Sequence, residues 1–135
     1  MKTETAAYLA NAAEALQDAK AILAIGIARQ AARLAYYAQF HAAQALIFER
    51  TDSVAKTHRG VKIQFHKFAN EDPRLGRSLA GDLAATYHFK EAADYETGAE
   101  NTISPEDAAE AIRVAERFVV AVRDALSDSP TNSND

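Results

Sequence analysis

Apolar residues recur every three or four positions along most of the chain, which is the spacing of one face of an α-helix. No stretch alternates apolar and polar residues in the way that a half-buried strand would. The pattern predicts five helical segments: about 5–25, 27–49, 57–69, 72–93 and 104–126.

The last segment has the most regular apolar spacing. Its apolar positions step by four, three, four, three and four residues, and we expect them to face the core: Ala108, Ile112, Ala115, Val119, Val122 and Leu126. The first segment repeats the spacing with Leu9, Ala13, Leu16, Ala19 and Leu23. On the short third segment, one face is expected to carry His58, Val61, Phe65 and Phe68.

Local signals set the predicted boundaries. Asp72 followed by Pro73 predicts the start of the fourth helix, because Asp can cap free amides and Pro is tolerated in the first turn. Ser104 with Asp107 three residues later predicts a reciprocal cap for the last helix. The polar residues 127–135 predict a disordered tail, so residues 1–126 are expected to form one helical domain.

Four long helices and one short helix, joined by tight loops, predict an all-α, antiparallel up-down bundle. Alanine is frequent, and alanine-rich faces let long helices approach closely. No linker is long enough to separate two domains.

Composition narrows the functional classes. The 135 residues include no Cys, so thiolate metal sites and thiol nucleophiles are excluded. No signal peptide is readable at the start and no apolar stretch approaches a membrane span, so a cytoplasmic protein without membrane contact is expected. The net charge is −4. Because extensive phosphate binding usually needs a basic excess, any RNA contact must be local or involve a partner.

Three motifs, in order, resemble a branch of the HEPN family: short stand-alone proteins encoded beside nucleotidyltransferases. Residues 32–43, ARLAYYAQFHAA, are similar to the branch's R-x-x-Y-Y-A-x-F-H-A-A signature. Residues 56–61, KTHRGV, are similar to K-T-H-x-G-V, and residues 93–95 match A-D-Y. The resemblance covers about residues 5–126, nearly all of the predicted folded part.

The resemblance implies a dimer that pairs with a minimal nucleotidyltransferase as toxin and antitoxin. Many such relatives are ribonucleases that need neither a metal nor another cofactor. Their signature is an Arg followed four to six residues later by a His, often with a Tyr two residues further on. In such enzymes the Arg stabilises phosphate charge and the His moves a proton from the 2′-hydroxyl.

This chain departs from that signature. Aligned on the A-D-Y motif, the Arg position falls on Lys90 and the His position near Asp94. Lysine keeps the charge but lacks the bidentate fork of arginine. Aspartate is a weak base at neutral pH. The expected catalytic positions are nevertheless Lys90, Asp94 and Tyr95, and the resemblance makes Tyr95 a candidate target of nucleotide transfer by the partner enzyme.

A second set of charges satisfies the Arg-to-His spacing elsewhere. Arg59 and His66 are therefore candidate catalytic residues as well. They lie about two turns apart on one helical face, so both could meet one phosphate, although chance alone is expected to give about one such match. Two roles are open for His58. It is either a partly buried residue at the start of a helix or a site residue that faces Lys90 and Tyr95. For RNA or nucleotide binding the sequence therefore offers His58, together with Arg33 and Tyr37 from an aromatic run that otherwise reads as core.

Two functions follow from these patterns. The first is a toxin-type effector that recognises RNA, with or without metal-independent ribonuclease activity. The second is a non-catalytic dimeric module that docks a nucleotidyltransferase or holds a nucleotide between helices. No pair of histidines has the i, i+4 spacing of a helical metal site, so no metal is expected.

Overall fold

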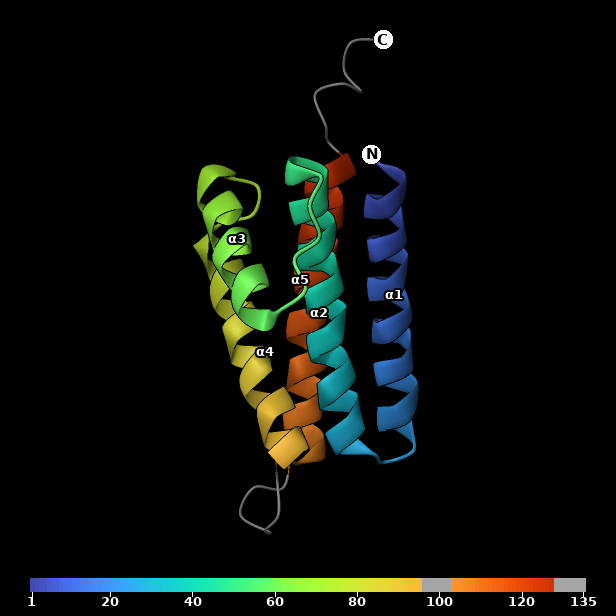
Figure 1. Ribbon diagram of the computed structural model, residues 1–135. Helices are drawn as coiled ribbons and strands as arrows, with labels where there is room; N and C mark the ends of the chain where they lie inside the picture. Colours follow the sequence, from blue (N-terminus) through green and yellow to red (C-terminus); the bar gives the residue numbers. More distant parts are fainter. Residues whose placement is uncertain (96–102, 128–135) are drawn as a thin grey trace.

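The first two helices form an antiparallel hairpin. In the computed structural model, which describes residues 1–95 and 103–127, α1 spans Thr3–Ala24 and α2 spans Ala28–Thr51. Gly26, in the turn between them, has a φ of 86°, in the left-handed region that glycine adopts most readily. The turn therefore ends the first helix at a residue that needs no side chain, and α2 runs back beside α1 (Figure 1).

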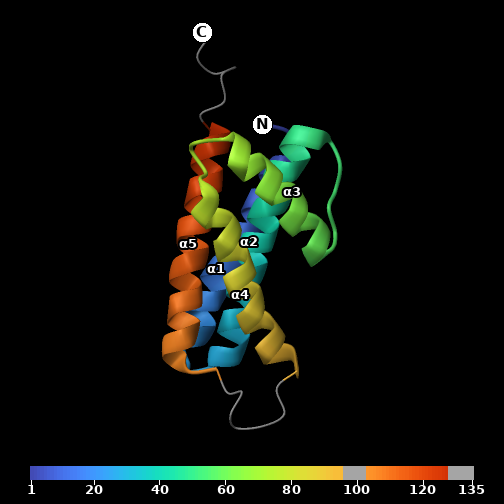
Figure 2. The ribbon, with the colours of Figure 1, turned by 90° about the vertical axis from the view of Figure 1, so that its left-hand side faces the viewer.

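The remaining helices complete the bundle around α2. They are α3 (His58–Glu71), α4 (Arg77–Tyr95) and α5 (Pro105–Ser127), and α2 packs against all four of the other helices. The short α3 lies alongside the first half of α4, whereas α5 runs the length of the bundle (Figure 2). The prediction of an all-α up-down bundle with four long helices and one short helix is confirmed.

The core follows the predicted apolar faces closely in α5 and less closely in α1. All six predicted core positions of α5 are buried, and the ring of Phe118 packs at a tilt against that of Phe65 of α3, with the centroids 4.8 Å apart. In α1, by contrast, Ala13 is exposed, and the fully buried positions are Thr5, Ala12 and Ala19. The larger leucines of α1 lie half-buried at the edges of this face.

Among the described residues, no helix combines the length and the apolar composition that a membrane crossing requires.

The fourth helix begins later than predicted. Asp72 does not cap it but ends α3, and residues 72–76 form a turn before α4 begins at Arg77. The Asp72 carboxylate accepts from the backbone N–H of Arg74 at 3.0 Å, and its carbonyl accepts from Leu75 and Gly76. The aspartate satisfies amides as expected, but these amides belong to a turn that Gly76 closes with a φ of 78°.

The cap predicted for the last helix is present. The backbone N–H of Asp107 donates to Ser104 Oγ at 3.0 Å, and the backbone N–H of Ser104 donates to Asp107 Oδ2 at 3.4 Å. At the other end, Ser127 belongs to α5 rather than to the predicted tail, and residues 128–135 lie outside the described part.

Candidate functional site

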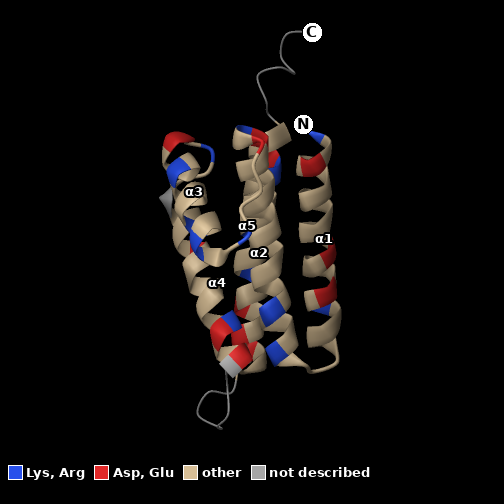
Figure 3. Cartoon of the chain, viewed as in Figure 1, with Lys and Arg blue, Asp and Glu red and all other residues tan. Residues whose placement is uncertain are grey.

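Polar side chains gather where the first half of α2, the start of α3 and the second half of α4 meet. We call this group the α2–α3–α4 cluster; it consists of Arg33, Tyr36, Tyr37, His58, Tyr87, Lys90 and Asp94. Tyr87, Lys90 and Asp94 fall at i, i+3 and i+7 on α4, so helical spacing alone places them on one side of that helix. The charged part of the cluster lies at the end of the bundle where α4 finishes and α2 begins (Figure 3).

One carboxylate holds both cations of the cluster. Asp94 Oδ1 accepts from Arg33 Nε at 2.8 Å, and Asp94 Oδ2 lies 2.7 Å from Lys90 Nζ. Arg33 Nη2 also donates to the carbonyl of Ala93 at 3.2 Å. The hydrogen bond from Lys90, and then that from Arg33, hold the pKa of Asp94 below its usual value, whereas the same contact with Asp94 raises the pKa of Lys90. Asp94 and Lys90 therefore stay ionised at neutral pH.

His58 is held between two tyrosines. Its ring stacks on that of Tyr87 with centroids 3.5 Å apart and planes 10° apart, and its Nδ1 lies 2.7 Å from the hydroxyl of Tyr36. Burial, and after it the charge of Lys62, lower the pKa of His58, so the neutral ring is favoured. Burial also raises the pKa of the Tyr36 hydroxyl, which therefore keeps its proton.

The proton of the Tyr36 hydroxyl decides the form of His58. Tyr36 is 2% exposed, and a buried hydroxyl must donate its proton to an acceptor. Because His58 Nδ1 is the hydrogen-bond partner of this hydroxyl among the described residues, it acts as the acceptor. A neutral imidazole that accepts at Nδ1 carries its own proton on Nε2. His58 can therefore offer an uncharged N–H donor to a ligand, but its Nδ1 is not available as a base.

The structure brings together five of the eight residues predicted to form the site. Arg33, Tyr37, His58, Lys90 and Asp94 all belong to the cluster. The side chain of a sixth, Tyr95, lies outside the described part of the chain, so its predicted proximity to His58 stays a prediction.

The side chains of Arg59 and His66 make none of the contacts that hold this cluster together. Both side chains are exposed on α3, and neither forms a hydrogen bond or an ion pair with another described residue. Seven residues of helical rise, about 10 Å, separate the two along α3. Because α3 runs antiparallel to α4, that rise leads away from Lys90 (Figure 1).

Two cluster residues were missed by the sequence interpretation. Tyr36 was assigned to the core as part of an aromatic run, and it is indeed buried, but it also supplies the hydrogen bond to His58. Tyr87 lies outside the three motifs that point to the site. The i, i+3, i+7 spacing of Tyr87 with Lys90 and Asp94 was readable and could have identified it.

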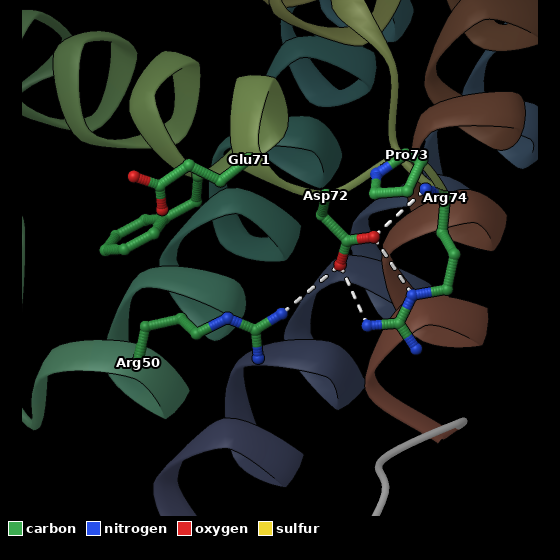
Figure 4. Close-up of a pocket in the computed structure, with 6 residues that line it drawn as sticks. Arg50, Glu71, Asp72, Pro73 and Arg74 are labelled. Atoms are coloured by element: carbon green, nitrogen blue, oxygen red, sulfur yellow. Dashed lines mark hydrogen bonds and ion pairs between the residues drawn. The ribbon is translucent and has the colours of Figure 1, made fainter.

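A separate pocket of about 510 Å³ lies at the other end of the bundle, and its lining residues are shown in Figure 4: Arg50, Phe68, Glu71, Asp72, Pro73 and Arg74. Two guanidinium groups there point at the Asp72 carboxylate, that of Arg74 at 2.8 Å and that of Arg50 at 3.4 Å. Hydrogen bonds from Arg74 hold the pKa of Asp72 below its usual value. These contacts fix the α3–α4 turn.

Nowhere in residues 1–95 and 103–127 do three His, Asp or Glu side chains lie in an arrangement that could hold a metal ion.

Comparisons with known proteins show the family, two relatives and the fold. The family model described as the HEPN domain matches residues 5–125. A UPF0332 protein of Archaeoglobus fulgidus is 30% identical over 87% of this chain and 90% of its own length. The Putative toxin MJ0605 of Methanocaldococcus jannaschii is 29% identical over 95% of this chain and 92% of its own length. The crystal structure of TT1696 from Thermus thermophilus superposes on this chain with a TM-score of 0.76. The match covers 91% of this chain and 98% of that one at 19% sequence identity, and it supports the fold.

Proposed function

The chain belongs to the HEPN family, and from this membership we propose that it is the toxin-type effector of a HEPN and nucleotidyltransferase pair, and that it recognises RNA at the α2–α3–α4 cluster. The relative named as a toxin, which aligns over nearly the whole chain, supports the first half of this proposal. The geometry of the cluster supports the second half.

The observation that carries the RNA proposal is the convergence of Arg33 and Lys90 from two helices. Both cations lie within 2.8 Å of one half-exposed carboxylate, so a phosphate that arrives there meets charges that are already in position. An ammonium has three N–H donors, and the contact with Asp94 takes one of those of Lys90. His58 adds a neutral donor beside them. This set of donors suits phosphate oxygens, which only accept.

The same geometry favours binding over cleavage within this cluster. Cleavage of RNA through its 2′-hydroxyl needs a base that can take a proton. Asp94 is held ionised with a lowered pKa, which makes it a weaker base than an ordinary aspartate. His58 has its Nδ1 occupied by Tyr36. We therefore assign the cluster residues to RNA binding, and ribonuclease activity is treated as a separate outcome to be measured.

The test compares RNA binding and growth inhibition between matched lysine variants. Lys90→Ala is expected to weaken the binding of single-stranded RNA several-fold and to reduce growth inhibition on induced expression. Lys20→Ala is the control, because Lys20 forms an exposed pair with Glu116 on a different part of the surface. Equal RNA affinity in the wild type and Lys90→Ala would overturn the site assignment. Incubation with tRNA, followed by gel analysis, would show whether cleavage accompanies binding.

A second function is favoured by the charge of the molecule. Asp94 already neutralises part of the charge of Arg33 and Lys90, and the chain carries a net charge of −4. Both facts suit a non-catalytic module that docks a protein partner. We propose a homodimer that binds the minimal nucleotidyltransferase. Co-purification with the nucleotidyltransferase encoded by a neighbouring reading frame, and light scattering on a sizing column, test these two assemblies. Co-purification without any RNA binding would support this function over the first.

A further inference from the structure

A second histidine, His41, lies one helical turn beyond Tyr37 on the half-exposed side of α2. The segment that links α2 to α3 runs back along α2 (Figure 1). A buried side chain connects the two, since Gln44 Nε2 donates to the carbonyl of Ala55 in that segment at 2.7 Å. Gln44 is 8% exposed, so its amide is fixed by this bond and not by solvent.

The orientation of Gln44 fixes the proton of His41. Because the amide nitrogen of Gln44 faces Ala55, its oxygen faces His41, and Oε1 lies 2.9 Å from His41 Nδ1. An amide oxygen only accepts, so His41 Nδ1 must carry the proton. In the neutral ring the other nitrogen, Nε2, then holds a lone pair and acts as an acceptor.

The two histidines therefore present opposite polarity. Tyr36 donates to Nδ1 of His58 and leaves an N–H at Nε2, whereas Gln44 accepts from Nδ1 of His41 and leaves a lone pair at Nε2. One ring offers a donor and the other an acceptor.

Tyr37 connects His41 to the cluster. The ring of Tyr37 stacks near that of His41 with centroids 6.5 Å apart, and it also packs edge-on against the ring of Tyr36 with centroids 5.4 Å apart. Tyr37 also lies one helical turn beyond Arg33, whose guanidinium shares the Asp94 carboxylate with Lys90. A ligand held at Lys90 can therefore extend along α2 past Tyr37 to His41.

An acceptor beside a phosphate-binding site has a specific use. Phosphate and ether oxygens of a nucleic-acid backbone only accept, so a DNA backbone gives His41 Nε2 no partner. The 2′-hydroxyl of RNA is the one backbone group that can donate. We propose that His41 Nε2 accepts the 2′-hydroxyl of an RNA bound at the α2–α3–α4 cluster, with Gln44 as its positioning residue, and so makes the protein select RNA over DNA. This inference rests on the proposed RNA recognition.

The test measures binding of single strands of one sequence that differ only at the 2′ position. Fluorescence anisotropy at about pH 8, where an imidazole is ordinarily neutral, compares ribose, deoxyribose and 2′-fluoro strands. The 2′-fluoro strand keeps an electronegative 2′ substituent but cannot donate. We expect wild type to bind the ribose strand several-fold more tightly than the other two. His41→Phe and Gln44→Met should both lose this preference, and His88→Phe, on the exposed side of α4, should keep it.

The outcomes separate this inference from the function on which it rests. RNA binding with equal affinity for the 2′-fluoro strand would overturn the role of His41 and leave RNA recognition standing. Absence of RNA binding would overturn both. Nitrogen NMR of the histidine rings gives a readout independent of binding, with the neutral proton expected on Nδ1 in His41 and on Nε2 in His58. A proton on Nε2 of His41 would contradict the proposal without any ligand.

Discussion

At the scale of single residues, neighbours decide which chemical form of a side chain the fold holds. His58 and His41 both contact α2 side chains, yet a tyrosine hydroxyl faces one ring and an amide oxygen faces the other. The same residue type is therefore a donor in one place and an acceptor in the other. For His58 the partner comes from a different helix, whereas for His41 it is a neighbour on the same helix whose amide is oriented by the carbonyl of Ala55.

The lowered pKa of His58 predicts a pH-dependent stability. As the pH falls below about 6.5, the ordinary histidine value, the unfolded chain takes up a proton before the folded chain does. The free energy of unfolding should therefore fall until the pH passes the lower pKa of folded His58. His58→Phe keeps a ring on Tyr87 but cannot titrate. Urea unfolding at about pH 7.5 and 5.5 should show a smaller loss of stability in this variant than in wild type; equal losses would contradict the assignment.

Two glutamines of α2 make a matched pair with opposite expected effects. Gln39 is fully buried, and neither of its amide atoms has a hydrogen-bond partner among the described residues, whereas Gln44 uses both of its amide atoms. A buried polar group without a partner costs about 1–3 kcal/mol. Gln39→Met, which is similar in length and apolar, should therefore raise the free energy of unfolding by about 1 kcal/mol.

Gln44→Met should instead lower the free energy of unfolding by about 1–3 kcal/mol, because it leaves the Ala55 carbonyl without its donor. Thermal and urea unfolding of both variants would measure the pair. Destabilisation by Gln39→Met would indicate that the amide has a stabilising role.

At the scale of elements, helix boundaries are set by which backbone amides find partners. Ser104 and Asp107 begin α5 by bonding each other's amides. Asp72 bonds the amide of Arg74 in the same way, but the chain then turns and Gly76 takes a left-handed conformation before α4 begins. A polar side chain that accepts from a nearby backbone amide therefore begins a helix at Ser104 but ends one at Asp72.

Two glycines around the start of α4 should respond oppositely to alanine. Gly76 has a φ of 78°, a conformation that costs a residue with a Cβ about 1–2 kcal/mol, so Gly76→Ala should destabilise the protein by that order. Gly81 lies inside α4 with an ordinary φ and no atom within 4 Å of an added Cβ. Gly81→Ala should stabilise the protein by about 0.5–1 kcal/mol. Thermal unfolding of the two variants measures both changes in stability. If both variants were stabilised, or both destabilised, the helix boundary placed at Gly76 would be contradicted.

At the scale of the whole molecule, an acidic bundle carries a small local set of cations. The net charge of −4 repels nucleic acid at a distance, whereas Arg33 and Lys90 act only at close range. Any RNA bound at the cluster therefore makes few phosphate contacts.

This charge distribution predicts a shallow salt dependence. Each phosphate neutralised on a single strand contributes about −0.7 to the slope of log affinity against log salt, so two cations give a slope of about −1.4. Lys90→Ala should bring the slope to about −0.7. Anisotropy titrations across a series of salt concentrations measure both values. A much steeper slope would show that further cations take part, and exposed Arg59 and Lys62 on α3 would be the first to examine.

Much of this protein was determined by its sequence alone. The apolar period gave five helices, the buried face of α5 and the class of bundle, and the motifs around Arg33, His58 and Asp94 indicated the family. These signals are local, because a helix forms hydrogen bonds within four residues and a cap within three. Five of the eight predicted site residues also met in one cluster, since the motifs that contained them lie on helices that pack together.

Tertiary structure alone decided the rest. The exposed positions of Arg59, His66 and Ala13 and the stacking of His58 on Tyr87 depend on the height and rotation of one helix against another. The orientation of Gln44 depends on where the segment between α2 and α3 places the carbonyl of Ala55. Those quantities are set jointly by side chains from several helices, and no stretch of the chain encodes them by itself. For the same reason, the proton position on His58 could be assigned only once Tyr36 was known to face it, and that on His41 only once Ala55 was known to orient Gln44.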